Sequence, residues 1–156
     1  MSDQVIASDK PLTHAERRNL AAISDIMIPA DITYGVPGAG DELIQNELLL
    51  ILRTQHQAII NALTCLDELS SGAAGSFADL VPPERAEVAE RFRRKRGDLA
   101  AVLVSLTLQV YYRDDRVLAS LDMEPRAPYP QGYQVESGDW SLLDPVRARE
   151  PFYRKV

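Results

Sequence analysis

Apolar residues recur every three or four positions between Asp41 and Leu69, and this spacing restricts the fold more than any other feature of the chain. Such spacing places them along one side of an α-helix. A helix over these 29 residues would be about 44 Å long at 1.5 Å per residue. Further apolar residues widen the stripe near its start, so we expect a central helix of a helical domain. The stripe consists of Leu48, Ile51, Leu52, Ile59, Leu63, Leu66 and Leu69.

A second helix is expected before this one. Thr13 and Glu16 have the spacing of a capping box, in which each side chain bonds the other residue's backbone N–H. Pro29 should end this helix, because a residue before proline is disfavoured in the helical region. Residues 31–40 contain three glycines and a proline, and this composition predicts a loop.

Three more helices are expected after residue 80. Pro82-Pro83 can occupy a first helical turn without loss of a hydrogen bond, and a charged helix follows. Gly97 is expected to end it in the left-handed conformation, and Asp98 to cap the next helix, from Leu99 to about Tyr112. A short helix is expected over Asp115–Leu121. The sequence therefore predicts an all-α protein with a compact domain of four to five helices.

The composition changes at residue 122. Residues 122–156 hold five of the ten prolines and five of the ten aromatic residues of the chain. Prolines at this density exclude a long helix or an interior strand. The aromatic residues are unlike a disordered linker, which usually has few. We therefore expect two parts, a helical domain over 1–121 and a long, irregular C-terminal arm over 122–156.

The charge and the single cysteine exclude several classes of protein. A net charge of −6 and a pI of about 4.9 disfavour nucleic acid as the main partner. Cys65 alone cannot form an internal disulfide or a multi-cysteine metal site; it is expected to pack as a small apolar side chain, and a disulfide to another chain is the alternative. Without a signal-type or membrane-spanning apolar run, we expect a cytoplasmic protein, or a periplasmic one exported with a partner.

Residues that could perform catalysis are scarce. His14 and His56 are the only histidines, and no HExxH or Glu-x-x-His pattern accompanies them. Gly35, Gly38 and Gly40 follow a predicted helix rather than a strand and lack the GK[ST] signature of a phosphate-binding loop. No Ser–His–Asp set can be assembled. The sequence therefore predicts no catalytic, cofactor-binding or metal-binding residue in this chain.

Five basic residues lie close together between Arg91 and Arg96. They are expected to form a solvated helix end, because Glu84, Glu87 and Glu90 share the helix. The alternatives are contact with an acidic partner surface and a helical regulatory module that binds nucleic acid through this run. A free-standing enzyme is a further alternative, although no acid–base pair supports it.

The aromatic residues of the arm have two interpretations. They could pack back on the helical domain and complete its core, or they could pack on another protein chain. We favour another chain, because tryptophan, tyrosine and arginine are the usual anchors of protein interfaces. The residues expected to bind the partner are Tyr129, Tyr133, Trp140, Arg147 and Phe152.

Three blocks of the sequence resemble the gluconate 2-dehydrogenase subunit 3 family. The first runs from Leu12 to Asp31. The second combines Tyr111-Tyr112-Arg113-Asp114 with Arg116-Val117-Leu118. The third and most specific runs from Pro128 to Arg147 and includes Gly132-Tyr133 and Gly138-Asp139-Trp140. Together the blocks frame nearly the whole chain.

This resemblance implies a function that spacing alone does not indicate. Members of the family are small, non-catalytic subunits of FAD-dependent sugar or alcohol dehydrogenases. Their large partner resembles the glucose–methanol–choline oxidoreductases and binds the FAD, and some complexes add a multihaem cytochrome c. The small subunit supports folding, maturation or export of the large one. Many members carry a twin-arginine signal, which we do not find in this sequence.

Overall fold

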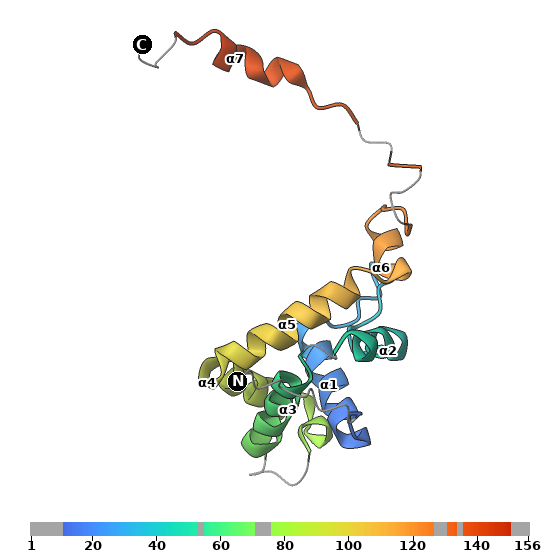
Figure 1. The fold of residues 1–156 in the computed structure, drawn as a ribbon, viewed down its shortest axis with the longest axis vertical. Helices are drawn as coiled ribbons and strands as arrows, with labels where there is room; N and C mark the ends of the chain where they lie inside the picture. The colour runs from blue at the N-terminus through green and yellow to red at the C-terminus, as the bar shows by residue number, and fades with distance from the viewer. Residues whose placement is uncertain (1–10, 53–54, 71–75, 127–130, 134–135, 151–156) are drawn as a thin grey trace, which may run out of the picture. The chain divides into compact units, whose positions relative to one another are not determined.

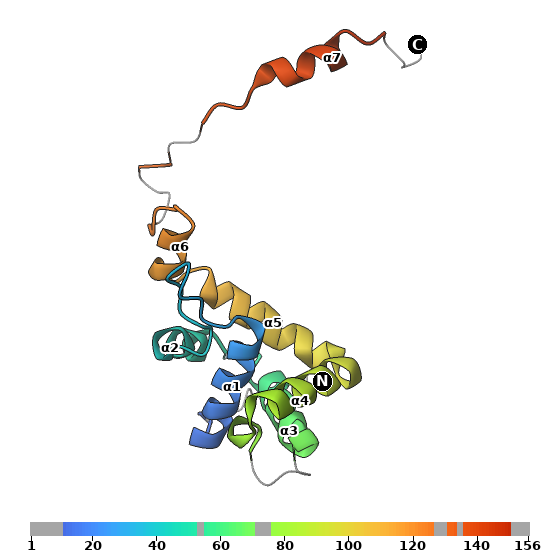
Figure 2. The same ribbon diagram turned by 180° about the vertical axis from the view of Figure 1, so that it is seen from behind.

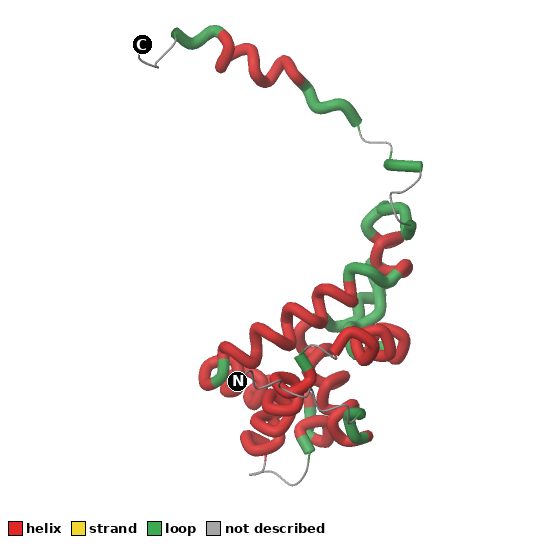
Figure 3. Tube along the Cα trace, viewed as in Figure 1, coloured by secondary structure: helices red, strands yellow, loops and turns green. Residues whose placement is uncertain are grey.

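The computed structural model describes residues 11–52, 55–70, 76–126, 131–133 and 136–150. Over these residues the protein is all-α, as predicted: it has helices and loops, and the one β-type pairing is an isolated bridge between Asp31 and Val36 (Figure 3). The chain divides into two units, residues 1–125 and 126–156, so the division lies four residues beyond the predicted boundary.

The first unit contains six α-helices and a 3₁₀ turn among its described residues (Figure 1). α5 packs against α1, α2, α3 and α4 and is the central helix of the unit. Figure 2 shows the same arrangement from behind. The elements are α1 (His14–Met27), α2 (Glu42–Ile51), α3 (His56–Ser70), η2 (Phe77–Asp79), α4 (Pro82–Lys95), α5 (Gly97–Tyr111) and α6 (Asp115–Ser120).

α1 begins and ends as the sequence predicts. The backbone N–H of Thr13 donates to Glu16 Oε2 at 2.7 Å, and the N–H of Glu16 donates to Thr13 Oγ1 at 3.3 Å, which completes the capping box. The helix ends at Met27, and Ile28 before Pro29 is extended. The helix buries Leu20 and Ile23, among other residues, in the core.

The predicted single helix over 41–69 is wrong, because two helices occupy this stretch. α2 ends at Ile51 and α3 begins at His56. Residues 53–57 are all polar, so the sequence places no apolar side chain at the junction of the two helices. The stripe itself is correct: Leu48, Leu52, Ile59, Leu63 and Leu66 are buried, with Ile51 and Leu69 partly buried.

The predicted roles of Gly97 and Asp98 are also wrong. Gly97 is the first residue of α5 and does not have a positive φ, and the residue that links α4 to α5 is Arg96, with φ −134° and ψ 56°. A link of one non-helical residue turns the chain without a left-handed position, so no glycine is needed. Asp98 lies in the first turn of α5, and its carboxylate accepts from Arg96 Nη2 at 2.9 Å.

A buried polar network holds η2 against α1 and α3. Asn19 is completely buried; its amide nitrogen donates to Asp67 Oδ1 at 2.7 Å, and its amide oxygen accepts from the N–H of Ala78 at 2.9 Å and from the hydroxyl of Ser76. Asp67 Oδ1 also accepts from the N–H of Phe77 at 3.0 Å. One asparagine thus joins three segments of the chain, and Phe77 is completely buried beside it.

The loop after α1 approaches that helix closely through two glycines. The N–H of Gly40 donates to Asp25 Oδ1 at 2.7 Å. A Cβ at Gly40 would lie 2.7 Å from the carbonyl oxygen of Ala21, and a Cβ at Gly38 would meet the Asp25 carboxylate. A backbone carbonyl in a helix cannot move aside without breaking the helix, so position 40 accepts only glycine.

Gly40→Ala is therefore expected to lower the free energy of unfolding by about 2 kcal/mol, because the added methyl group overpacks against Ala21. Urea denaturation of the purified chain measures this loss. Gly97→Ala is the control: a Cβ there meets no atom within 4 Å, and alanine is a better helix former, so stability should stay equal or rise slightly. Equal stability for the two variants would contradict the close contact.

The second unit has little secondary structure. Its described residues contain η3 (Trp140–Leu143), which continues directly into α7 (Asp144–Arg147). All described side chains from residue 136 to residue 150 are exposed. Over its described residues, this part of the chain matches the predicted irregular C-terminal arm.

Candidate functional site

The arm forms one ordered element around Trp140. Asp139 caps it: Oδ1 accepts from the N–H of Ser141 at 2.9 Å and from its hydroxyl at 2.6 Å. These bonds stabilise the carboxylate and lower the pKa of Asp139. Pro145 lies in the first turn of α7, where its missing N–H costs nothing. Local signals thus set the start of this helical segment, residues 139–147, which we call the arm helix.

The arm helix carries exposed apolar side chains. Trp140 is 68% exposed and Leu142 is 74% exposed, and Leu143 and Val146 are also exposed. Trp140, Leu143 and Val146 are spaced three residues apart, so they lie on neighbouring positions of one side. A helical segment this short has marginal stability by itself and is stabilised mainly by packing. A binding surface would therefore both stabilise the arm helix and cover its apolar side chains.

The five residues predicted to bind a partner differ in their structural setting. Trp140 is exposed on the arm helix, as an anchor must be before it binds. Arg147 is exposed, and its Nη1 lies 3.3 Å from Asp144 Oδ1 one turn earlier. Tyr129 and Phe152 lie outside the described residues. Sequence reasoning missed Leu142, Leu143 and Val146, although their spacing from Trp140 was readable.

Tyr133 is half exposed and makes contacts within the arm itself. Its hydroxyl donates to the carbonyl oxygen of Arg126, and the Arg126 guanidinium lies 5.1 Å from the centre of its ring. Arg126 Nη2 also donates to the carbonyl oxygen of Gly132 at 2.7 Å, and Gly132 has a positive φ of 68°. Tyr133 therefore helps to shape the start of the arm.

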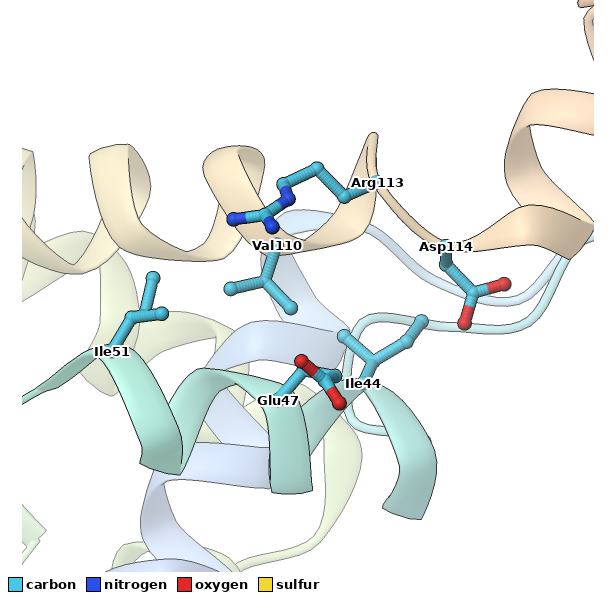
Figure 4. Close-up of a pocket in the computed structure, with 6 residues that line it drawn as sticks. All are labelled: Ile44, Glu47, Ile51, Val110, Arg113 and Asp114. Carbon is cyan, nitrogen blue, oxygen red and sulfur yellow. The ribbon is translucent and has the colours of Figure 1, made fainter. Parts of the chain in front are cut away.

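A small pocket lies between α2 and the end of α5 (Figure 4). Ile44 and Ile51 of α2 face Val110 of α5, and the charged side chains of Glu47 and Arg113 border the space. Its volume is about 120 Å³. Pockets that hold small ligands or cofactors usually measure about 300–1,000 Å³. This pocket is large enough for one side chain of a partner, and no nucleophile–base pair lines it.

The two histidines and the single cysteine lie on α1 and α3. His14 is exposed in the first turn of α1, and His56 is half-buried at the start of α3. Cys65 is a free, half-buried thiol that packs beside the core, as an apolar side chain would. No group of three or more metal-ligating side chains occurs within the ranges that the structure describes.

Most of the cations between Arg91 and Arg96 are engaged within the chain. Arg91 Nη2 donates to the carbonyl oxygen of Leu69 at 3.1 Å. Arg93 and Arg94 pair with Glu90, and Arg96 pairs with Asp98. The hydrogen bond from the Arg96 guanidinium is the main cause that lowers the pKa of Asp98 to about 2. This pairing favours the predicted solvated helix end over a nucleic-acid surface.

Arg116 joins the start of α2 to the start of α6. Its Nη2 lies 2.8 Å from Asp41 Oδ1 and 2.8 Å from Asp114 Oδ2, and both aspartates also cap helices. The Arg116 guanidinium lowers the pKa of both carboxyl groups by hydrogen bonding, and the two carboxylates raise the pKa of Arg116. This network fixes the 31–40 loop and α6 at the same end of the first unit (Figure 2).

The network predicts a loss of stability in acid. Because the pKa values of Asp41 and Asp114 are lower in the folded state than the usual 3.8, their contribution is complete above pH 3.8 and is lost as the pH falls below it. Arg116→Met should cost about 1 kcal/mol at neutral pH, a small value because the side chain is partly exposed. The difference in the free energy of unfolding between this variant and wild type should disappear in acid. Urea denaturation at pH 7 and pH 3 measures that difference. Arg113→Met is the control; a pH-independent gap for Arg116→Met would contradict the network.

Comparisons with protein-family models, with curated proteins and with solved structures find no match to this chain. None of the helices in the described ranges has the length and apolar character needed to cross a lipid bilayer.

Proposed function

We propose that this chain is a non-catalytic small subunit of a FAD-dependent dehydrogenase that oxidises a sugar or alcohol hydroxyl group. One observation carries the proposal: the arm helix carries four exposed apolar side chains, Trp140, Leu142, Leu143 and Val146. A second protein surface that covers these side chains would remove them from water, at about 25 cal/mol per Å² of apolar area. The resemblance to the gluconate 2-dehydrogenase subunit 3 family names the class of partner.

In this proposal the large flavoprotein subunit binds the FAD and carries out hydride transfer, and a cytochrome c is a further candidate member of the complex. The small subunit acts by binding. Because it binds the folded partner and not the unfolded one, it shifts the folding equilibrium of the partner by mass action.

Co-expression tests the proposal. The flavin-containing dehydrogenase subunit of the same source organism is produced with the full chain, with residues 1–125, or alone. The full chain is expected to raise the yield of soluble, yellow, active enzyme several-fold, and residues 1–125 are expected to raise it far less. Equal yield and activity with and without residues 126–156 would refute the role of the arm. Turnover of a sugar by the small chain alone would refute the non-catalytic role.

A further inference from the structure

α5 is apolar on its solvent side as well as on the side that faces the core. From Leu99 to Tyr112 the chain contains no charged residue. Figures 1 and 2 show α1, α2, α3 and α4 on one side of α5. On its exposed side Val104, Leu108 and Tyr112 are 41%, 40% and 52% exposed. A helix that is apolar all round is usually covered all round, so this side of α5 is a candidate interaction surface.

Four exposed residues form one row along this side, which we call the α5 stripe. They follow one another at intervals of four, three and four residues, the spacing of neighbours on one face of a helix. The α5 stripe consists of Ala101, Ser105, Leu108 and Tyr112. α3, which packs against α5, has polar residues on its own exposed side, namely Gln57, Asn61 and Thr64. The exposed side of α5 therefore lacks the polar cover that its neighbour has.

The α5 stripe is complementary to itself when two copies pair antiparallel. Its two small residues, Ala101 and Ser105, lie in its first half, and its two large residues, Leu108 and Tyr112, lie in its second half. The numbers of opposed residues in an antiparallel pair have a constant sum. Ala101 can therefore lie opposite Tyr112 of the second copy while Ser105 lies opposite Leu108. Small residues then face large ones along the whole contact, whereas a parallel pair would leave a gap at one end.

The charges at the two ends of α5 favour the same orientation. Around the start of α5, residues 90–98 hold five basic and two acidic residues. Around its end, residues 113–124 hold two basic and four acidic residues, and Asp41 adds an acid there through its pair with Arg116. The start is thus net positive and the end net negative. An antiparallel pair brings each positive end to the negative end of the other copy, and a parallel pair brings like charges together.

We propose that two copies of this chain associate through their α5 stripes in an antiparallel pair with two-fold symmetry. The inference concerns the first unit alone and does not depend on the function proposed above. An apolar groove of about 200 Å³ between α1, α4 and α5 extends the contact, because Val104 lines it together with Ile26 and Met27. A single pair of helices is still smaller than a standard interface of about 1,600 Å². The dimer is therefore expected to be weak, with a dissociation constant on the order of 10 µM.

Sedimentation velocity of the purified full chain over a series of concentrations tests the dimer. Ser105→Glu and Ser105→Lys each place two like charges close to the two-fold axis, and each is expected to raise the dissociation constant at least about 30-fold. An equimolar mixture of the two variants should restore the dimer, because unlike charges then meet. Thr64→Glu adds the same charge to the exposed side of α3 and should change the constant by less than a factor of about three. All these residues are exposed, so the thermal midpoints should stay at the wild-type value.

Disulfide formation tests the orientation, in chains that also carry Cys65→Ser. Ala101→Cys and Tyr112→Cys are prepared as separate chains and oxidised alone or mixed. In the antiparallel pair the two copies of position 101 are about 16 Å apart along the helix axis, too far for a disulfide. Position 101 of one copy lies opposite position 112 of the other, so the mixture is expected to form the linked dimer and neither chain alone should do so.

Three results would overturn the inference. A wild-type chain that stays monomeric at every concentration shows that α5 is not a contact between copies, whichever segment or protein then covers it. A dimer that keeps its affinity in both Ser105 variants has its interface elsewhere. Disulfides that form in either cysteine chain alone and not in the mixture contradict the antiparallel arrangement. Each of these results leaves the proposed role of the arm intact, because no measurement here involves the flavoprotein.

Discussion

A chain with Trp140→Ser, Leu143→Ser and Val146→Ser is expected to bind its flavoprotein partner at least about 100-fold more weakly than wild type. Each of these side chains contributes on the order of 1.5–3 kcal/mol when it is fully buried. Because all three are exposed in the free chain, the substitutions should leave its thermal stability unchanged. Calorimetric titration of the flavoprotein with each chain measures the difference.

The matched control for the arm changes polar residues that flank the same segment. Glu136→Ser with Glu150→Ser leaves the apolar side chains in place, and these glutamates are exposed as well. This chain should bind within a few-fold of wild type, because exposed charges at the rim of an interface contribute little. If the triple variant keeps wild-type affinity, the arm helix is not an anchor.

Asn19→Ala is expected to lower the free energy of unfolding by about 3 kcal/mol, the largest stability loss that we predict for a single substitution. The change removes the hydrogen bonds that the Asn19 side chain makes with Asp67 Oδ1 and with the N–H of Ala78. Three kcal/mol is a large part of the 5–15 kcal/mol that usually stabilises a folded domain. Thermal unfolding followed by circular dichroism should show a midpoint lower by about 10 °C.

Asn61→Ala is the control for this substitution. Asn61 is an exposed residue of α3 whose side-chain oxygen accepts from Gln57 at 3.0 Å. Water replaces that bond at once, so the stability should change by less than about 0.5 kcal/mol. If the two asparagine variants are equally stable, the buried network does not hold η2 in place.

The sequence predicts those parts of the fold that depend on local signals. The capping box at Thr13, the stop at Pro29 and the start at Pro82 act over a few residues, and all three are confirmed. The break between α2 and α3 escaped prediction because Leu52 and Ile59 are seven residues apart, which keeps both on one side of a continuous helix. The periodicity identified the buried residues without locating the turn between them.

Contacts between distant residues could not be predicted from spacing. Asn19 bonds residues 48 to 59 positions away, and Asp25 bonds Gly40 15 positions away, so no window along the sequence contains both partners. The one indication of this network in the sequence is an asparagine on the apolar side of α1. Burial of an amide requires partners, which the fold alone reveals.

The candidate site was predicted in part. Trp140 is exposed on the arm, and its role as an anchor for a partner stays a prediction. Leu143 and Val146 follow it at helical spacing and were overlooked because Pro145 between them argued against a helix. Proline is in fact favourable there, since it stands in a first helical turn. Ile32 and Tyr34 were assigned to a plain loop, and only the structure shows that both side chains are exposed.

The fluorescence of Trp140 tests the central claim most directly, because it is the only tryptophan of the chain. In the free chain its emission should be that of an indole in water, and addition of the flavoprotein subunit should shift it to shorter wavelength with saturable, stoichiometric binding. An emission already at the wavelength of a buried indole in the free chain, unchanged by the flavoprotein, would contradict the account.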